Sequence, residues 1–214
     1  MRPTPGEDNV IPMKLDLPAG TFAGYIFDLD GTLIDSMPLH YRAWDAAMRR
    51  FGLDRPLDED MFYGLGGVPT RQVAEIMGAH YGLKLNADQV MTAKEELYLK
   101  DMEAVRVIEP VAAIARRVAA EGFPVAIVTG GTPDVVEPAL RAAGLKAIFS
   151  LVITPLDVPP GRGKPAPDMF LLAAQRMQLD PKDCLVFEDA EPGLAAARAA
   201  GMQVVHVPSR RVKA

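Results

Sequence analysis

Cysteine is almost absent from this chain, and its single thiol, Cys184, cannot form an intrachain disulfide. Proteins of oxidising compartments often rely on disulfides, so this lack agrees with a cytoplasmic protein. We interpret Cys184 as a core thiol, because it precedes the apolar residues 185–187 and no sequence neighbour offers it a base. Histidine is also scarce, and His80 and His206, which have no partner in the sequence pattern, are interpreted as structural.

Long apolar runs and an excess of positive charge are missing as well. No apolar run approaches the roughly 20 residues that cross a membrane, and residues 1–16 hold no apolar core long enough for a signal peptide. The net charge is −5 with both signs interspersed, which gives no basic patch for nucleic acid or an anionic membrane. We therefore expect neither of them as a partner.

What the chain does contain is enough apolar material for a sizeable core. Of its 214 residues, 49% are hydrophobic and 24% are charged, which fits one large or two small globular domains. Residues 1–20 are rich in proline and glycine, and we expect them to form an irregular leader.

Apolar runs of strand length alternate with helical periodicities through most of the chain. The expected strands comprise residues 25–27, 124–129, 148–153, 184–188 and 202–207, and the expected helices between the later strands comprise residues 110–122, 133–143, 167–178 and 191–200. Strands separated by helices pair in parallel, with helices on both faces of the sheet. The pattern therefore predicts an α/β fold with a doubly wound, Rossmann-like parallel sheet.

A block of purely helical patterns, residues 36–103, separates the first strand from the others. Its expected helices are one marked by Tyr41, Trp44, Met48 and Phe51 at steps of three or four, and three over residues 58–63, 69–81 and 87–103. Such an insertion is a natural lid over a site at the strand ends. We therefore expect a core domain of residues 21–35 and 104–214 and an all-helical cap domain of residues 36–103.

Two aspartates, Asp28 and Asp30, follow the first expected strand directly. Open parallel sheets bind ligands at the carboxyl ends of their strands, so chemistry is expected at this position. Two carboxylates this close repel each other unless a cation joins them or one keeps a proton. A lone pair of this kind is also compatible with an ordinary acidic turn.

Polar residues also follow three later strands or their loops. They are Thr129-Gly130-Gly131, Lys164 and Glu188-Asp189. Singly, each has an ordinary interpretation, because a threonine can cap a helix, a lysine can be solvated and an acidic pair can form a turn. Together, at successive strand ends, they favour phosphoryl transfer. Lysine and close backbone N–H groups suit a phosphate, and carboxylates suit Mg²⁺.

The sequence Asp28-Leu29-Asp30-Gly31-Thr32 after an apolar strand resembles the first motif of the haloacid dehalogenase superfamily. Thr129, Lys164 and the pair Glu188–Asp189 follow in the order of its later motifs. The resemblance implies a Mg²⁺ cofactor, a nucleophile at Asp28 that forms an aspartyl-phosphate, and a general acid and base at Asp30. Dehalogenase members lack an acid at the second position, so Asp30 argues for phosphate chemistry.

The same resemblance implies a ligand set for Mg²⁺. Asp28 and Asp189 would bind the ion directly, Asp30 through its backbone carbonyl, and Glu188 through water. An unperturbed aspartate has a pKa of about 3.9, so Asp28 is expected to be ionised at neutral pH. Asp30 needs a raised pKa to give a proton to the leaving alcohol.

The helical block resembles the small cap of the β-phosphoglucomutase-like branch. On that resemblance His40, Arg71 and Lys94 are candidate substrate contacts, although Arg71 and Lys94 could face solvent and His40 could cap or pack. Three basic groups over a phosphate site would suit a phosphorylated sugar or sugar acid as the small-molecule partner, with Gly130 and Gly131 also near the substrate.

Thr32 is typical of the phosphatases of this branch, whereas its mutases carry valine there. We therefore expect a phosphatase similar to the fructose-1-phosphate and 6-phosphogluconate phosphatases. A sugar phosphomutase and a non-enzymatic binding protein remain alternatives. A phosphonate hydrolase would need a cap lysine with a lowered pKa, for which the acidic neighbours of Lys94 give no reason. A monomer or a weak dimer is expected.

Overall fold

The computed structural model of the protein describes residues 13–208. Residues 1–12 of the expected leader lie outside this range, and residues 13–20 contain no helix or strand. Within the described range, no helix has the length and apolar character needed to cross a membrane.

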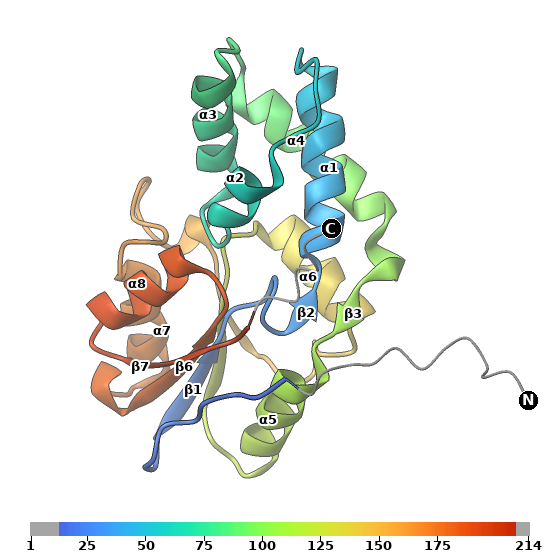
Figure 1. Ribbon diagram of the computed structural model, residues 1–214. Helices are drawn as coiled ribbons and strands as arrows, with labels where there is room; N and C mark the ends of the chain where they lie inside the picture. The colour runs from blue at the N-terminus through green and yellow to red at the C-terminus, as the bar shows by residue number, and fades with distance from the viewer. Residues whose placement is uncertain (1–12, 209–214) are drawn as a thin grey trace, which may run out of the picture.

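A parallel sheet of five strands forms the centre of the molecule (Figure 1). Its strands are β1 (Gly24–Phe27), β4 (Val125–Val128), β5 (Leu151–Ile153), β6 (Cys184–Glu188) and β7 (Gln203–His206). The order across the sheet is β5-β4-β1-β6-β7, and every neighbouring pair is parallel. The predicted α/β fold is confirmed, with β5 shorter than its expected range.

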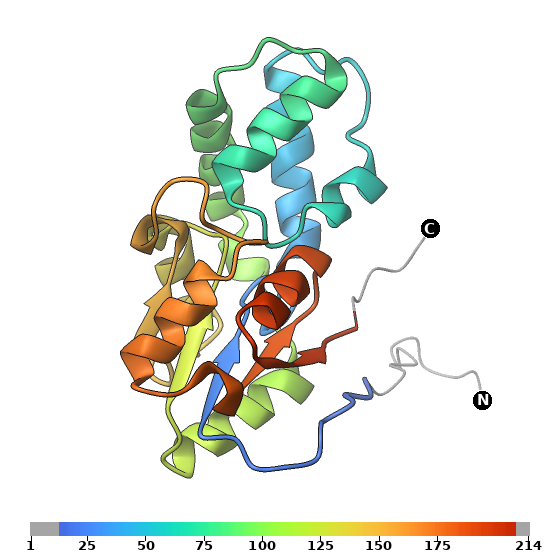
Figure 2. The same ribbon diagram turned by 90° about the vertical axis from the view of Figure 1, so that its left-hand side faces the viewer.

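Successive residues of β1 point to opposite faces of the sheet, as the two-residue period of a strand requires. Phe27 packs in the cluster that includes α5 (Glu109–Ala120) and α6 (Pro133–Ala142). Ile26 packs in the cluster that includes α7 (Asp168–Met177) and α8 (Glu191–Ala199). Figure 2 shows α7 and α8, in orange and red, in front of the sheet and α5 behind it.

Four helices stand above the carboxyl ends of the strands (Figure 1). They are α1 (Met37–Arg50), α2 (Glu59–Gly64), α3 (Thr70–Tyr81) and α4 (Ala87–Lys100), and short 3₁₀ segments occur at Met102–Ala104, Pro155–Asp157 and Pro181–Asp183. These four helices enclose a separate apolar cluster around Trp44, Met48 and Phe62. A cluster of their own supports the proposed division into core and cap.

A short antiparallel ribbon, which the sequence did not predict, joins the sheet to these helices. It pairs β2 (Ile34–Asp35) with β3 (Arg106–Val107). Each strand has two residues, too few to display an alternating pattern. The chain therefore leaves the sheet and returns to it side by side, close to the proposed boundaries at residues 35 and 104.

Candidate active site

Asp28 lies at the middle of the sheet edge because β1 is the central strand. Its backbone N–H donates to the carbonyl of Phe187 at 2.9 Å, which continues the pairing of β1 with β6. Thr129 follows β4 on one side of β1, and Glu188 ends β6 on the other. The parallel order of the strands thus brings together three of the predicted site residues.

Lys164 reaches this edge from the loop after β5 and is fully buried. Its Nζ lies 2.7 Å from Oδ1 of Asp28 and 2.6 Å from Oε2 of Glu188. Burial lowers the pKa of Lys164, but the two carboxylates outweigh burial and raise that pKa above its usual value. The ammonium of Lys164 therefore stays charged beside Asp28. The alternative that Lys164 is solvated was wrong.

Asp28, Glu188 and Asp189 form an acidic cluster, with a ligand atom of each within 4.8 Å of the others. Burial and the charge of Glu188 raise the pKa of Asp28 well above its ordinary value, although Lys164 opposes them. Burial and Glu188 likewise raise the pKa of Asp189 to about 7. The expectation that Asp28 has the pKa of a free aspartate was wrong, because burial and the neighbouring carboxylate of Glu188 raise its pKa.

This cluster suits a divalent metal ion. Lys164 supplies one positive charge for three carboxylates, of which Asp28 and Glu188 are buried and Asp189 is partly buried, and oxygen ligands of this kind are those that Mg²⁺ prefers. Gly31 allows the close approach of Asp189, since its φ is +92° and a Cβ there would collide with the Asp189 carboxylate. Thr32 fixes the same carboxylate by donating to its Oδ1 at 3.0 Å.

Asp30 lies at the side of the cluster that faces the cap. Its Oδ1 accepts a hydrogen bond from the Ser36 hydroxyl at 2.5 Å and lies 3.0 Å from Nε2 of His40. Burial raises the pKa of Asp30, but His40, Ser36 and Lys94 together lower it below the usual value. The expectation of a raised pKa was therefore wrong for the protein without substrate.

His40 and Lys94 both come from the cap and are buried against aromatic rings, and His40 also contacts Asp30. The imidazole of His40 stacks on Tyr98 with ring centroids 3.9 Å apart, and its Nδ1 has no hydrogen-bond partner among the described residues. Nζ of Lys94 lies 5.2 Å from the centre of the Tyr98 ring and 5.8 Å from that of Trp44. Burial lowers the pKa of Lys94 to about 8, so the expectation of an ordinary pKa was wrong, and that pKa no longer argues against a phosphonate hydrolase.

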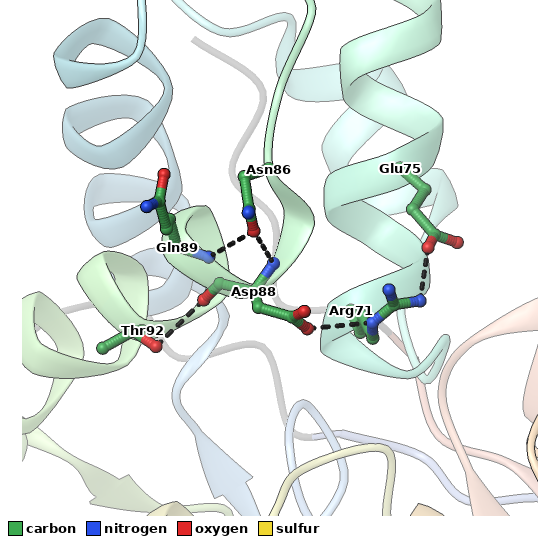
Figure 3. Close-up of polar contacts among 6 residues, drawn as sticks. All are labelled: Arg71, Glu75, Asn86, Asp88, Gln89 and Thr92. Atoms are coloured by element: carbon green, nitrogen blue, oxygen red, sulfur yellow. Dashed lines mark hydrogen bonds and ion pairs between the residues drawn. The ribbon is translucent and has the colours of Figure 1, made fainter.

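Arg71 does not enter the site. Its side chain is 57% exposed on α3 and pairs with Glu75, one turn along the same helix, and with Asp88 of α4 at 2.9 Å (Figure 3). Asn86 caps the start of α4 and thereby places Asp88 opposite the guanidinium. The expected substrate contact of Arg71 is corrected to a surface ion pair between two cap helices.

A cavity of about 70 Å³ lies between the sheet edge and the cap. Its lining includes Asp28, Asp30, Thr129 and Gly130 from the sheet side and His40 and Lys94 from the cap. Ligand pockets commonly measure about 300–1,000 Å³, so this cavity is smaller than a typical site for a sugar phosphate. The cap is thus closed over the sheet edge in this structure.

Glycines permit this closure, because the cap loop meets the sheet edge backbone to backbone. A Cβ on Gly130 would lie 2.8 Å from the carbonyl oxygen of Gly67, and one on Gly163 would lie 2.6 Å from Cγ of Pro69. The backbone N–H of Gly131 donates to Oγ1 of Thr129 at 3.1 Å and is already occupied in this arrangement.

Two residues of the cavity region escaped the sequence analysis. Glu95 of α4 lines the cavity and accepts a hydrogen bond at 3.2 Å from the hydroxyl of Thr132, which precedes α6. The only signal in the sequence was their adjacency, since Glu95 follows Lys94 and Thr132 follows Gly131. That adjacency does not reveal a contact between the cap and the sheet.

Comparison with known proteins gives a consistent picture. The sequence model of haloacid dehalogenase-like hydrolases matches residues 22–201. Fructose-1-phosphate phosphatase YqaB of Escherichia coli is 36% identical over 190 residues, which are 87% of this chain and 96% of that protein. Hexitol phosphatase A of Escherichia coli is 34% identical over 184 residues, which are 86% of this chain and 82% of that protein.

Among solved structures, β-phosphoglucomutase from Clostridium difficile superposes with a TM-score of 0.76 at 20% identity. The superposition covers 86% of this chain and 83% of that one. At this identity the likeness concerns the fold, including the helices above the sheet.

Proposed function

The chain belongs to the haloacid dehalogenase-like hydrolases, and from this membership we propose that it is a Mg²⁺-dependent phosphatase of a small phosphorylated sugar or sugar acid. The membership confirms the resemblance predicted from the aspartate, threonine, lysine and acidic-pair motifs. The observation that carries the proposal is the buried Lys164 between Asp28 and Glu188, with Asp30 beside them. In such an arrangement a positive charge lies beside the attacking carboxylate and can attract a phosphate anion to it.

Hydrolysis would proceed in two steps on the residues of the chain. First, an Asp28 oxygen forms a bond to phosphorus, the bond from phosphorus to the leaving oxygen breaks, and Asp30 gives that oxygen a proton. Then Asp30 takes a proton from water, whose oxygen replaces Asp28 on phosphorus and releases inorganic phosphate. The aspartyl-phosphate between the two steps converts one difficult reaction into two easier ones.

Asp30 must be protonated for the first step and ionised for the second. Without substrate its lowered pKa favours the ionised form. A phosphate dianion in the cavity would add negative charge beside Asp30 and raise its pKa, which prepares the acid form when it is needed. Ser36 and His40 hold the carboxylate in place for both steps.

Mg²⁺, when bound, would offset the repulsion between the carboxylates and the phosphate. Asp28 and Asp189 are the proposed direct ligands, with the backbone carbonyl of Asp30, and Glu188 would act through water. Glu188 already accepts from Lys164 and from the backbone N–H of Ala190 at 3.1 Å, which suits an indirect role. Thr129 and Lys164 would bind the phosphoryl oxygens as donors.

The partner is thus a small phosphomonoester. The single cysteine supports a cytoplasmic location, and a monomer or weak dimer stays a prediction.

The test is phosphate release from fructose 1-phosphate, 6-phosphogluconate and β-glucose 1-phosphate with Mg²⁺, while glucose 6-phosphate is followed in parallel. We expect release from at least one of them and a loss of about 1,000-fold or more in Asp28→Asn. Asp54→Asn, on an exposed loop of the cap, is the matched control and should retain activity. Glucose 6-phosphate formation without net phosphate release would instead identify a mutase, and inactivity on every phosphomonoester would refute the proposal.

A further inference from the structure

We propose that Glu95 selects the class of substrate, by accepting hydrogen bonds from the hydroxyls of a neutral sugar or polyol phosphate and repelling a substrate that carries its own carboxylate. The inference rests on the proposed phosphatase function and names the substrate class of that same site. It narrows the choice between a phosphorylated sugar and a phosphorylated sugar acid in favour of the first.

The position of Glu95 places it beside the organic part of the substrate. The phosphoryl group belongs next to Asp28 and Lys164, so the remainder must extend into the cap side of the cavity. Of the cavity-lining residues in the described part of the chain, Glu95 is the one acid that the cap contributes. It is only partly buried, and its hydrogen bond from Thr132 spans the gap between cap and sheet.

The charges on the cap side of the cavity disfavour a substrate carboxylate. Lys94 is the one lysine among the described residues that line the cavity, and the two carboxylates that attract it, Asp30 and Glu95, outnumber it there. Arg71, another cap base expected to attract an anion, pairs with Asp88 and Glu75 on the surface. A carboxylate brought to this side of the cavity would therefore meet a net negative charge, which is costly in a buried place.

Substrate hydroxyl groups, in contrast, can form hydrogen bonds with Glu95 and Thr132. A carboxylate offers about four acceptor positions, and the bond from Thr132 occupies one position on Glu95. The hydroxyl of Thr132 can also turn to bond a substrate oxygen, because it donates and accepts. A polyhydroxy chain can thus replace or extend the hydrogen bond that now joins Glu95 to Thr132.

The experiment compares two substrates that differ at one carbon, glucitol 6-phosphate and 6-phosphogluconate. Both are linear six-carbon chains with phosphate on C6, but C1 is an alcohol in the first and a carboxylate in the second. We expect kcat/KM of the wild-type protein to favour glucitol 6-phosphate by at least about tenfold. In Glu95→Gln, which keeps the shape and removes the charge, that preference should fall by at least about tenfold. The matched control is Glu96→Gln, an exposed neighbour that should leave the ratio unchanged.

Hydrolysis of p-nitrophenyl phosphate, which has neither sugar hydroxyls nor a carboxylate, tests the phosphatase activity separately from the selection by Glu95. If wild type and variants hydrolyse it but Glu95→Gln changes both sugar substrates by the same factor, the role of Glu95 in selection is overturned and the phosphatase stands. A wild-type preference for 6-phosphogluconate would have the same meaning. If no phosphomonoester is hydrolysed at all, the proposed function fails and the inference fails with it.

Discussion

Replacing Lys94 by methionine should stabilise the protein while it impairs the reaction. Lys94 is only 3% exposed and lies between Tyr98, Trp44 and the cavity, where no carboxylate comes within ion-pair distance among the described residues. Methionine fills a similar volume without a charge, so the substitution tests the cost of the buried ammonium rather than the cost of a hole.

The size of the effect follows from the pKa of Lys94, which burial lowers from 10.5 to about 8. Each pKa unit corresponds to about 1.4 kcal/mol, so the charged lysine costs up to about 3 kcal/mol at neutral pH. That value already includes the attraction of Asp30 and Glu95. We expect a gain of about 1–3 kcal/mol in the free energy of unfolding, or a Tm higher by several degrees, together with a lower kcat/KM.

Urea denaturation as a function of pH is the decisive assay. Between pH 8 and 10.5 the unfolded chain binds the Lys94 proton more strongly than the folded protein, so wild-type stability gains as pH rises. The advantage of Lys94→Met should therefore be complete below pH 8 and vanish near pH 10.5. Lys100→Met, exposed on the same helix, is the control without this trend. A variant that is less stable than wild type at pH 7 would refute the reasoning.

Three other predictions concern the cap, the surface and the metal. Gly130→Ala should lower kcat/KM at least about tenfold with unchanged circular dichroism, because its Cβ would meet the Gly67 carbonyl; Gly64→Ala, with open space around it, should not. Arg71→Gln should change kcat/KM less than about twofold, since an exposed ion pair contributes little; a larger loss would restore it as a substrate contact. Mg²⁺ should raise the Tm, and its affinity, measured by calorimetry, should increase as pH rises through about 7, where Asp189 loses its proton; a pH-independent affinity would contradict that assignment.

The site residues at the strand ends could be predicted from the sequence, because the polar residues that suit phosphate chemistry directly follow the apolar runs that form the strands. Asp28, Thr129 and Glu188 follow neighbouring strands of a parallel sheet, and parallel order alone sends such residues to one edge. The apolar runs also show where each strand ends and therefore which polar residues lie at its carboxyl end. Lys164 was predicted from its place in the chain, although its full burial between two carboxylates was not.

What the sequence did not reveal depends on contacts between distant segments. Arg71 and Lys94 are both basic residues on cap helices, yet one is exposed and the other buried, because the packing of the helices against each other decides which side faces the sheet. The bond of Glu95 to Thr132 joins positions 37 residues apart in sequence. The pKa of Asp30 required knowledge of His40 and Ser36 as neighbours.

The ribbon of β2 and β3 has a consequence for how such an enzyme can change over evolutionary time. Ile34 faces Val107 and Asp35 faces Arg106, so the chain departs and returns through adjacent positions. Much of the segment between them can lengthen, shorten or be exchanged while the strands of the sheet keep their positions. Selection for a new leaving group can therefore act on α1 to α4 with little effect on the strand ends, provided that Ser36 and His40 keep their contacts with Asp30.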